Sequence, residues 1–303
     1  MENAQETPMK NIVLALLICI IQATPAFADT FVVNNPVDPG NGICDAVGCT
    51  LREAIDAANA NPGADIINFS IFGAGVKTIT PTSALPTITE AVTIDGYTQP
   101  GAAENTLATG NDAVLLVELN GTLAGFGSSG LGIDSSDSRI RGLVINRFLT
   151  AGITLSGAGA DDNIIEGNFI GTNAGGTTDL GNAESGIAVN GASNNLIGGS
   201  QPSARNLIAG NGTAGVLIFS TVVGVTASAN IVEGNYIGTD ATGTAALGNA
   251  EDGVQSQSTP PIISSVAPQR APAISFRGTC EMGFTSPIWA ARVLVEVTGS
   301  KAI

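Results

Sequence analysis

The chain has 303 residues, a formal net charge of −15 and no histidine, and charged residues make up only 12% of it. The acidity argues against nucleic acid and anionic membrane surfaces as partners, because both need a basic footprint, and the lack of histidine excludes a Ser-His-Asp triad. An apolar fraction of 44% is too high for a disordered chain, and abundant glycine with few aromatic residues is typical of a β solenoid.

Residues 1–28 have the three parts of a secretory signal. Lys10 provides the positive charge, residues 12–23 form the apolar core, and Ala26-Phe27-Ala28 is a small-x-small cleavage site. The apolar core is too short for a transmembrane helix, and no other segment of the sequence is apolar over the length of a span. We therefore expect an exported chain, secreted or at the cell surface, with no membrane span in its mature form.

Two cysteines, Cys44 and Cys49, lie in the tight loop 40–49. Export places them in an oxidising compartment, where a disulfide between them is the expected state. A metal site would need more ligands than this loop offers, and we expect none there.

Thr50 and Glu53 form a capping box at the start of a short amphipathic helix. Thr50 is the expected N-cap, Glu53 reaches back to its backbone N–H, and the helix is expected over residues 51–60. A lone helix ahead of a solenoid has a structural use, since it covers the apolar side and strand edge that the first coil would otherwise expose. Residues 29–65 are therefore expected to form an N-terminal cap.

The segment Cys49-Thr-Leu-Arg-Glu-Ala54 resembles the N-terminal module of the CSLREA-domain proteins, with a cysteine upstream and Ala-Asn-Ala-Asn-Pro-Gly downstream. Thr50 stands where the name-giving motif has serine. Members of that family are secreted bacterial proteins in which the module precedes right-handed parallel β-helix repeats. The resemblance covers roughly residues 29–254; it implies that fold and export, and it implies no reaction.

Residues 66–254 contain short strand-like runs instead of helices. The earlier runs alternate with turns that carry Gly, Pro and Asp, and we expect them to form the less regular coils. They are residues 66–69, 76–79, 91–94, 114–119 and 143–145.

Residues 164–187 return almost unchanged as residues 231–254, with 16 of 24 positions identical. Gly before an apolar-x-apolar run recurs within this period, and such runs bury their apolar side only when stacked in parallel, at about 4.8 Å. The sequence predicts an all-β parallel β-helix with a short N-terminal capping α-helix, and the resemblance implies that it is right-handed. One column should hold the glycines Gly152, Gly186, Gly215 and Gly253.

Asparagine recurs at the ends of these runs, as in Asn163 to Asn168 and Asn206 to Asn211. Its side chain suits a turn position, where it can bond the neighbouring coil and form a ladder. The apolar positions of the runs should be buried, namely Ile165, Ile170, Ile187, Val189, Leu207, Val216, Ile218 and Ile237.

Polysaccharide-degrading enzymes commonly use this architecture, so charged clusters are candidates for a catalytic site. Hydrolysis of a glycosidic bond needs two facing carboxylates, for which the candidates are the adjacent Asp161 and Asp162, and Asp134 and Asp137 in a Ser-rich loop. Elimination from a uronic acid needs a base beside acidic Ca²⁺ ligands. Arg139, Arg141 and Arg147 cluster in sequence, and the nearby acids are Asp134, Asp137 and Asp162. Acids in solenoid turns are usually solvated, so none of these residues is assigned a catalytic role.

Other acids and aromatic residues recur or cluster as well. Glu166 and Glu233 occupy matched repeat positions, as do Glu184 and Glu251, and this recurrence favours a structural or surface role. No cofactor is expected, apart from the Ca²⁺ that a stripe of acids would attract.

The paired aromatic residues Phe169 and Tyr236 could stack on sugar rings, although one aromatic per repeat more often fills a core layer. The favoured function is a secreted or cell-surface β-helix repeat protein with a structural or adhesive role and a polysaccharide or cell-surface glycan as partner. The alternative is a carbohydrate-active enzyme, a polysaccharide lyase or glycoside hydrolase, on the same scaffold, because a fold does not fix a function.

The repeat pattern stops after Val254, and residues 255–303 are predicted to be a frameshifted tail. A shifted reading frame takes the third base of one residue's codon and the first two bases of the next residue's codon. Over residues 261–284, the degenerate codons permit this frame to encode Asn-Asn-Ile-Ile-Gly-Gly-Thr, then Arg-Asn-Ile-Ile-Ser-Gly-Asn, then Asp-Gly-Val. These match the unit that runs from Asn194 to Val216, at the same offset that separates Ile164 from Ile231. Such a tail should be poorly ordered, without function, and should leave the last coil uncapped.

Overall fold

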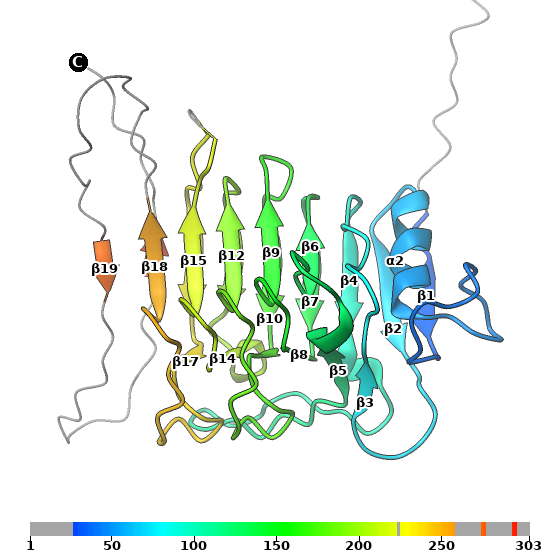
Figure 1. The fold of residues 1–303 in the computed structure, drawn as a ribbon, viewed down its shortest axis with the longest axis horizontal. Coiled ribbons are helices and arrows are strands. Elements are labelled where there is room, and N and C mark those ends of the chain that lie inside the picture. The colour runs from blue at the N-terminus through cyan, green and yellow to red at the C-terminus, as the bar shows by residue number, and fades with distance from the viewer. Residues whose placement is uncertain (1–26, 223–224, 258–273, 277–292, 296–303) are drawn as a thin grey trace, which may run out of the picture.

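The computed structural model describes residues 27–222, 225–257, 274–276 and 293–295, and they form a parallel β-helix. The predicted signal segment, except for its last two residues, and most of the tail after residue 257 lie outside the described residues. The chain winds repeatedly through three sheets, which we call A, B and C, so that each full coil contributes one strand to each (Figure 1). The predicted fold class is confirmed. Among the described residues, no helix is both long and apolar enough to cross a membrane.

Each sheet is a stack of short strands in chain order. Sheet A contains β1 (Thr30–Val33), β2 (Asp65–Phe69), β4 (Val92–Asp95), β7 (Arg139–Arg141), β10 (Ile164–Glu166), β13 (Leu196–Gly198), β16 (Asn230–Glu233) and β20 (Val293–Val295). Sheet B contains β3 (Lys77–Ile79), β5 (Val117–Asn120), β8 (Leu143–Asn146), β11 (Phe169–Ile170), β14 (Leu207–Ile208) and β17 (Tyr236–Ile237). Sheet C contains β6 (Leu131–Ile133), β9 (Ile153–Ser156), β12 (Ile187–Asn190), β15 (Val216–Phe219), β18 (Val254–Gln257) and β19 (Ile274–Phe276).

The long repeat of the sequence spans two coils. Ile164 pairs with Leu196 in the next coil, and Leu196 pairs in turn with Ile231, the copy of Ile164. From β10 onward the coils therefore alternate between two types, and the coil β16–β17–β18 is of the same type as β10–β11–β12. The predicted glycine column is present, because the N–H of the residue after each glycine donates to the next glycine's carbonyl oxygen, from Ile153 to Gly186, Ile187 to Gly215 and Val216 to Gly253.

Alternate side chains of the strands point into the coils and form continuous apolar columns, as period-two alternation requires. Seven of the eight residues that were predicted to be buried have no exposed surface. The exception is Ile237, which is only half-buried because β17 is the last strand of sheet B among the described residues.

Three asparagine ladders run along the corners of the coils. In each ladder, the backbone N–H of one asparagine donates to the side-chain oxygen of the asparagine in the next coil. Except for the half-buried Asn235 and Asn249 at the C-terminal end, these side chains are almost fully buried inside the stack, so each of their bonds satisfies a backbone group that water could not reach. The predicted ladders are confirmed, and they are Asn163–Asn195–Asn230, Asn168–Asn206–Asn235 and Asn182–Asn211–Asn249.

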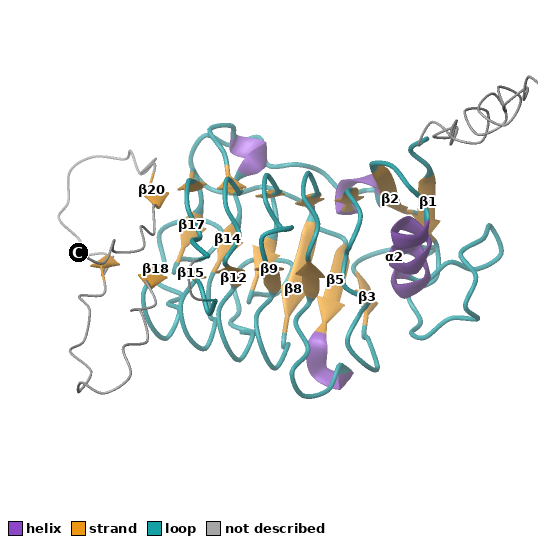
Figure 2. Cartoon of the chain, turned by 90° about the horizontal axis from the view of Figure 1, so that it is seen from above, coloured by secondary structure: helices purple, strands orange, loops and turns teal. Residues whose placement is uncertain are grey.

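The helix α2 (Leu51–Ala60) lies across the N-terminal end of the stack, where Figures 1 and 2 both place it beside β1 and β2. Its buried side is made by Leu51, Ala54, Ile55 and Ala58, which join the main core. The predicted cap and the observed helix therefore agree, and the helix removes the apolar end of the first coil from water.

A second apolar cluster lies outside sheet B. Its centre is Val144, Phe169 and Leu207, which are outward-facing neighbours on adjacent strands. The segment 99–114, which we call the strap, contributes to its cover and extends along several coils at the lower edge of Figure 1. Three short 3₁₀ helices, η1 (Gly96–Thr98), η2 (Gly121–Leu123) and η3 (Pro202–Ala204), lie in the connections between strands.

The repeat extends past the predicted boundary at residue 254, because β18 pairs with β15 through Gln257. Beyond it, the described strands β19 and β20 pair antiparallel with β18 and β16. The expectation of an uncapped last coil is therefore wrong for two of its three strands. The order of the remaining tail residues and the frameshift lie outside the described residues, so the frameshift stays a prediction.

Candidate functional site

The two arginine candidates, Arg139 and Arg141, lie on the outer face of sheet A and are held by carboxylates other than Asp161 and Asp162. Arg139 pairs with Glu166, with Nε 3.0 Å from Oε1. Arg141 pairs with Glu104 of the strap, with Asp95 at 3.5 Å and with Glu166 at 3.9 Å. Because strand register places Asp95, Arg141 and Glu166 side by side, their charges compensate each other along the stack.

Tyr97 completes this charged cluster on the side of the strap. Arg141 lies over its ring, 5.1 Å from the centroid, and its hydroxyl donates to the carbonyl oxygen of Gly167 at 2.7 Å. Burial raises the pKa of Tyr97 well above its ordinary value, so the hydroxyl remains a donor. The cluster is an ion network on the outer face of sheet A that joins three of its strands to the strap.

The acidic candidates Asp161 and Asp162 lie in the turn between sheets C and A. The carboxylate of Asp161 accepts the backbone N–H of Ser193 in the next coil at 2.6 Å, and Asp162 adopts a positive φ of 58°. No ion pair joins either acid to Arg139 or Arg141 in the described part of the chain. The structure thus places Asp161 and Asp162 in a turn and Arg139 and Arg141 in a separate ion network.

The aromatic candidates are also engaged within the protein. Phe169 is 1% exposed, in the cluster outside sheet B, and cannot stack on a ligand. Tyr236 is half-buried, accepts the N–H of Gly110 from the strap and lies under Arg205 at 4.6 Å. The prediction that the paired aromatic residues stack on sugar rings is therefore wrong for Phe169. Tyr236 instead holds the strap through its contacts with Gly110 and Arg205.

Arg205 was not singled out from the sequence, yet it holds the tip of the strap. Its guanidinium donates to the carbonyl oxygens of Leu107, Ala108 and Gly110 at 3.1, 2.9 and 2.6 Å. These bonds join segments that are far apart in the sequence, which is why no local pattern marks them. A planar guanidinium with several fixed donors suits such a set of carbonyl acceptors.

A pocket of about 370 Å³ lies on the outer face of sheet C, near the cap. Its floor contains Thr154 and Ser156 of β9 together with residues 132–134, and its walls contain residues of segments 84–87 and 127–129. Asp134 is the one carboxylate among the lining residues, and none of them is basic. Ser129, at the wall, shares hydrogen bonds with Thr150 and Thr154 at 2.8 and 2.9 Å. The lining of this small pocket thus carries several hydroxyl groups and one carboxylate.

The cap positions one wall of this pocket. Arg52 of α2 forms a bidentate pair with Asp38, at 2.7 and 3.0 Å, and donates to the carbonyl oxygens of Ser83 and Ala84. Burial disfavours the charged form of Asp38, but hydrogen bonds from Arg52 and Thr82 outweigh it and hold the pKa of Asp38 below its ordinary value. The Cys49–Ala54 segment therefore does more than close the stack, because its arginine fixes the segment that borders the pocket.

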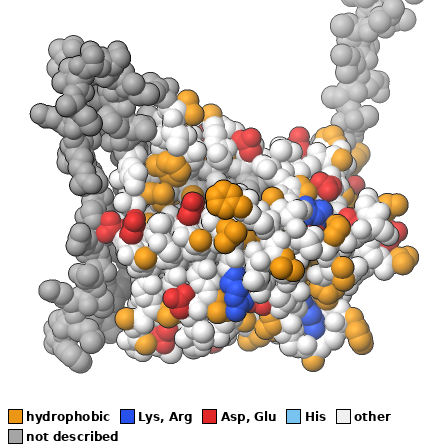
Figure 3. Space-filling model, in the orientation of Figure 1, with side chains coloured by type: hydrophobic (Ala, Val, Ile, Leu, Met, Phe, Trp, Pro, Cys, Tyr) orange, Lys and Arg blue, Asp and Glu red, His pale blue; other side chains and the backbone are white. Residues whose placement is uncertain are grey.

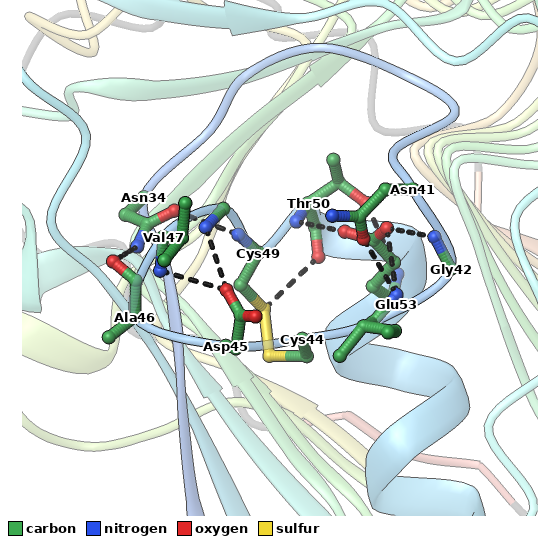
Figure 4. The surroundings of a disulfide bond; sticks show 12 residues. Asn34, Asn41, Gly42, Cys44, Asp45, Ala46, Val47, Cys49, Thr50 and Glu53 are labelled. Atoms are coloured by element: carbon green, nitrogen blue, oxygen red, sulfur yellow. Dashed lines mark hydrogen bonds between the residues drawn. A yellow bond between two sulfur atoms is a disulfide. The ribbon is translucent and has the colours of Figure 1, made fainter.

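A second set of contacts fixes the cap itself (Figure 4). Cys44 and Cys49 form the predicted disulfide, and the predicted capping box is present at Thr50 and Glu53. The Glu53 carboxylate accepts the N–H groups of Thr50 and of residues 42 and 43 in the preceding loop. Burial disfavours its charged form, but these three donors outweigh burial and hold the pKa of Glu53 below its ordinary value. Gly40 has no space for a side chain, since a Cβ there would collide with the same carboxylate.

Charged side chains are few and scattered on the face of the molecule that Figure 3 shows. Within the described ranges, no group of three or more His, Cys, Asp or Glu side chains is arranged to hold a metal ion. A stripe of acids was expected from the sequence to attract Ca²⁺, and the described part of the chain contains no such site. No protein-family model matches this chain, and no curated protein matches it either.

Proposed function

We propose that this chain is a secreted or cell-surface β-helix repeat protein with a structural or adhesive role, of the CSLREA-like kind that its cap segment resembles. We further propose that the pocket beside the cap is its point of contact with a neutral saccharide of a polysaccharide or cell-surface glycan. The observation that carries this is the lining of the pocket, which offers hydroxyl donors and acceptors and one carboxylate on a rigid sheet.

Export is supported by the signal-like segment 1–28 and by the disulfide, which persists in oxidising compartments. Mass spectrometry of the exported protein should find Asp29 at the mature N-terminus. Without reduction, the peptide that contains Cys44 and Cys49 should be lighter by two hydrogens. An unprocessed chain retained in the cytoplasm would contradict the proposal.

A neutral ligand fits the electrostatics better than an anionic one. The chain carries a net charge of −15, and the lining residues include Asp134 but no basic side chain that could pair with a uronate or sulfate. The carboxylate can accept hydrogen bonds from sugar hydroxyls, and the neighbouring hydroxyl groups can both donate to them and accept from them. Neither contact needs a charge on the ligand.

A binding role fits the geometry better than the enzymatic alternative. Glycosidic hydrolysis needs a pair of carboxylates across the bond, whereas the pocket lining supplies one. Arg139 and Arg141, the candidate bases for an elimination, are held in ion pairs away from Asp161 and Asp162. Turnover of any polysaccharide in a reducing-sugar or unsaturated-uronate assay would favour the enzyme instead.

A glycan array followed by calorimetry tests the binding proposal. Thr154→Val keeps the side-chain shape but removes one pocket hydroxyl, so it should weaken binding of the selected glycan by about tenfold. Thr109→Val is the matched control, because Thr109 is an exposed threonine on the strap and not among the pocket residues. Equal affinities for both variants and the wild-type chain would place the glycan elsewhere.

A further inference from the structure

At the C-terminal end of the stack, two ladder asparagines have backbone N–H groups that lack, among the described residues, the side-chain acceptors found inside the stack. Inside the stack, the N–H groups of Asn206 and Asn211 donate to the side-chain oxygens of Asn235 and Asn249. The N–H groups of Asn235 and Asn249 have no acceptor among residues 27–222 and 225–257. Both asparagines are half-buried, whereas Asn206 and Asn211 are at most 1% exposed.

The strand edges at this end are only partly covered. The strands β20 and β19 pair with β16 and β18, but both run antiparallel, unlike every earlier pairing along the stack. β17 is the last strand of sheet B within the described part of the chain. Inside the coil, Ser256 continues the column of Val189 and Ile218, so an apolar column ends on a polar side chain.

We propose that this end is a docking surface for one further coil of the same repeat, and that its occupant is the segment encoded by the alternative frame of residues 261–284. The three coils that carry the ladders differ in the sequence gaps between their successive ladder asparagines. A short gap precedes a long one in the coil of Asn163, Asn168 and Asn182, and the coil of Asn230, Asn235 and Asn249 repeats it.

The coil between these two has the opposite order, because a long gap separates Asn195 from Asn206 and a short one separates Asn206 from Asn211. The two types alternate over the last three described coils, and the last of them is of the type in which the short gap comes first. Continued alternation would place a coil in which the long gap comes first directly after it.

The alternative frame permits that type of coil at the required places. It permits asparagine at positions 262, 273 and 278, which follow Asn195, Asn206 and Asn211 at the offset of the visible repeat. In this chain the same positions hold Ile262, Ala273 and Gly278, none of which has a side-chain acceptor. Three ladders that arise from three separate corners of the fold are thus continued together, in one frame and at one offset.

Hydrogen exchange tests the docking surface directly. In the chain as it exists, the amides of Asn235 and Asn249 should exchange much faster than those of Asn206 and Asn211. In a full chain whose frame is restored near residue 255, both amides should become protected by at least about tenfold. Protected amides in the existing chain, or unchanged exchange in the restored one, would overturn the proposal.

The matched control is the restored chain with alanine in place of the three asparagines at positions 262, 273 and 278. Its backbone can still add a strand to β17, but it lacks the ladder acceptors, so the amides should again exchange fast. Sequencing of the gene provides an independent test, since a stop codon in the alternative frame over residues 261–284, or a frame that does not encode these residues, also overturns it. Neither result depends on glycan binding.

Discussion

The two ends of the stack contrast a closed coil with an open one. At the N-terminal end, α2 covers β1 and β2, and a disulfide and a capping box fix the helix. At the C-terminal end, Ile237 is half-buried, although the equivalent Ile170 in the preceding repeat has no exposed surface. The two isoleucines lie in nearly identical sequences, so the neighbouring coil determines their burial. A solenoid coil is stable through its neighbours, and each end needs its own solution.

The largest effect should separate interior from terminal ladder positions. Asn206→Ala removes the acceptor for Asn168 N–H and the donor to Ile165 carbonyl oxygen, both within the stack, and should lower the free energy of unfolding by about 3 kcal/mol. Asn235→Ala removes equivalent bonds at the open end, where water can replace them, and should cost about 1 kcal/mol. Chemical denaturation measures both. Equal losses would mean that the C-terminal end is as closed as the interior.

The next effect concerns the disulfide at the closed end. Cys44→Ser leaves the buried Cys49 in place and opens a loop whose ends are close in sequence. The chain-entropy relation for such a short loop predicts a loss of about 2 kcal/mol. Thermal unfolding with and without a reductant measures it, and the reductant should have no effect on the variant. A wild-type chain that is equally insensitive to the reductant would show that the bond adds no stability.

A smaller effect is expected at the helix start. Thr50→Ala removes the hydroxyl that accepts the N–H of Glu53 and should cost about 1 kcal/mol. Thr50→Ser is the control, since serine retains the hydroxyl and is also the residue of the motif that this segment resembles; its stability should stay close to that of the wild type. If Thr50→Ser were as unstable as Thr50→Ala, the methyl group and not the cap would be responsible.

The smallest effect should be a pH dependence confined to the cap. The pKa of Glu53 is lower in the folded chain than its ordinary value of 4.5, so its contribution is fully present above that value. It is then lost as the pH falls through the folded pKa. The difference in melting temperature between the wild-type chain and Glu53→Gln should therefore shrink between about pH 6 and pH 3. Asp38 shifts in the same direction and remains in both chains, so it cancels. A constant difference would exclude the carboxylate as the cause.

The sequence by itself determined the features that depend on local pattern or on an exact repeat. The capping box is defined by residues three apart, the disulfide by two cysteines in one loop, and the ladders by asparagines that recur with the coil. Each of these is written in neighbouring residues or copied at a fixed offset, so a period-two and repeat analysis finds it.

Only the tertiary structure decided where Arg52, Arg139, Arg141 and Arg205 make their contacts. The pairs of Arg141 with Glu104 and of Arg205 with the strap depend on how a long connection folds back over several coils. The sequence instead suggested grouping Arg139 and Arg141 with Asp134, Asp137 and Asp162, because those residues are near in the chain. In a β-helix, residues one coil apart in sequence are stacked side by side, whereas near residues can lie at different corners of a coil. Long-range electrostatics and the pocket beside the cap follow from that winding, which local pattern does not encode.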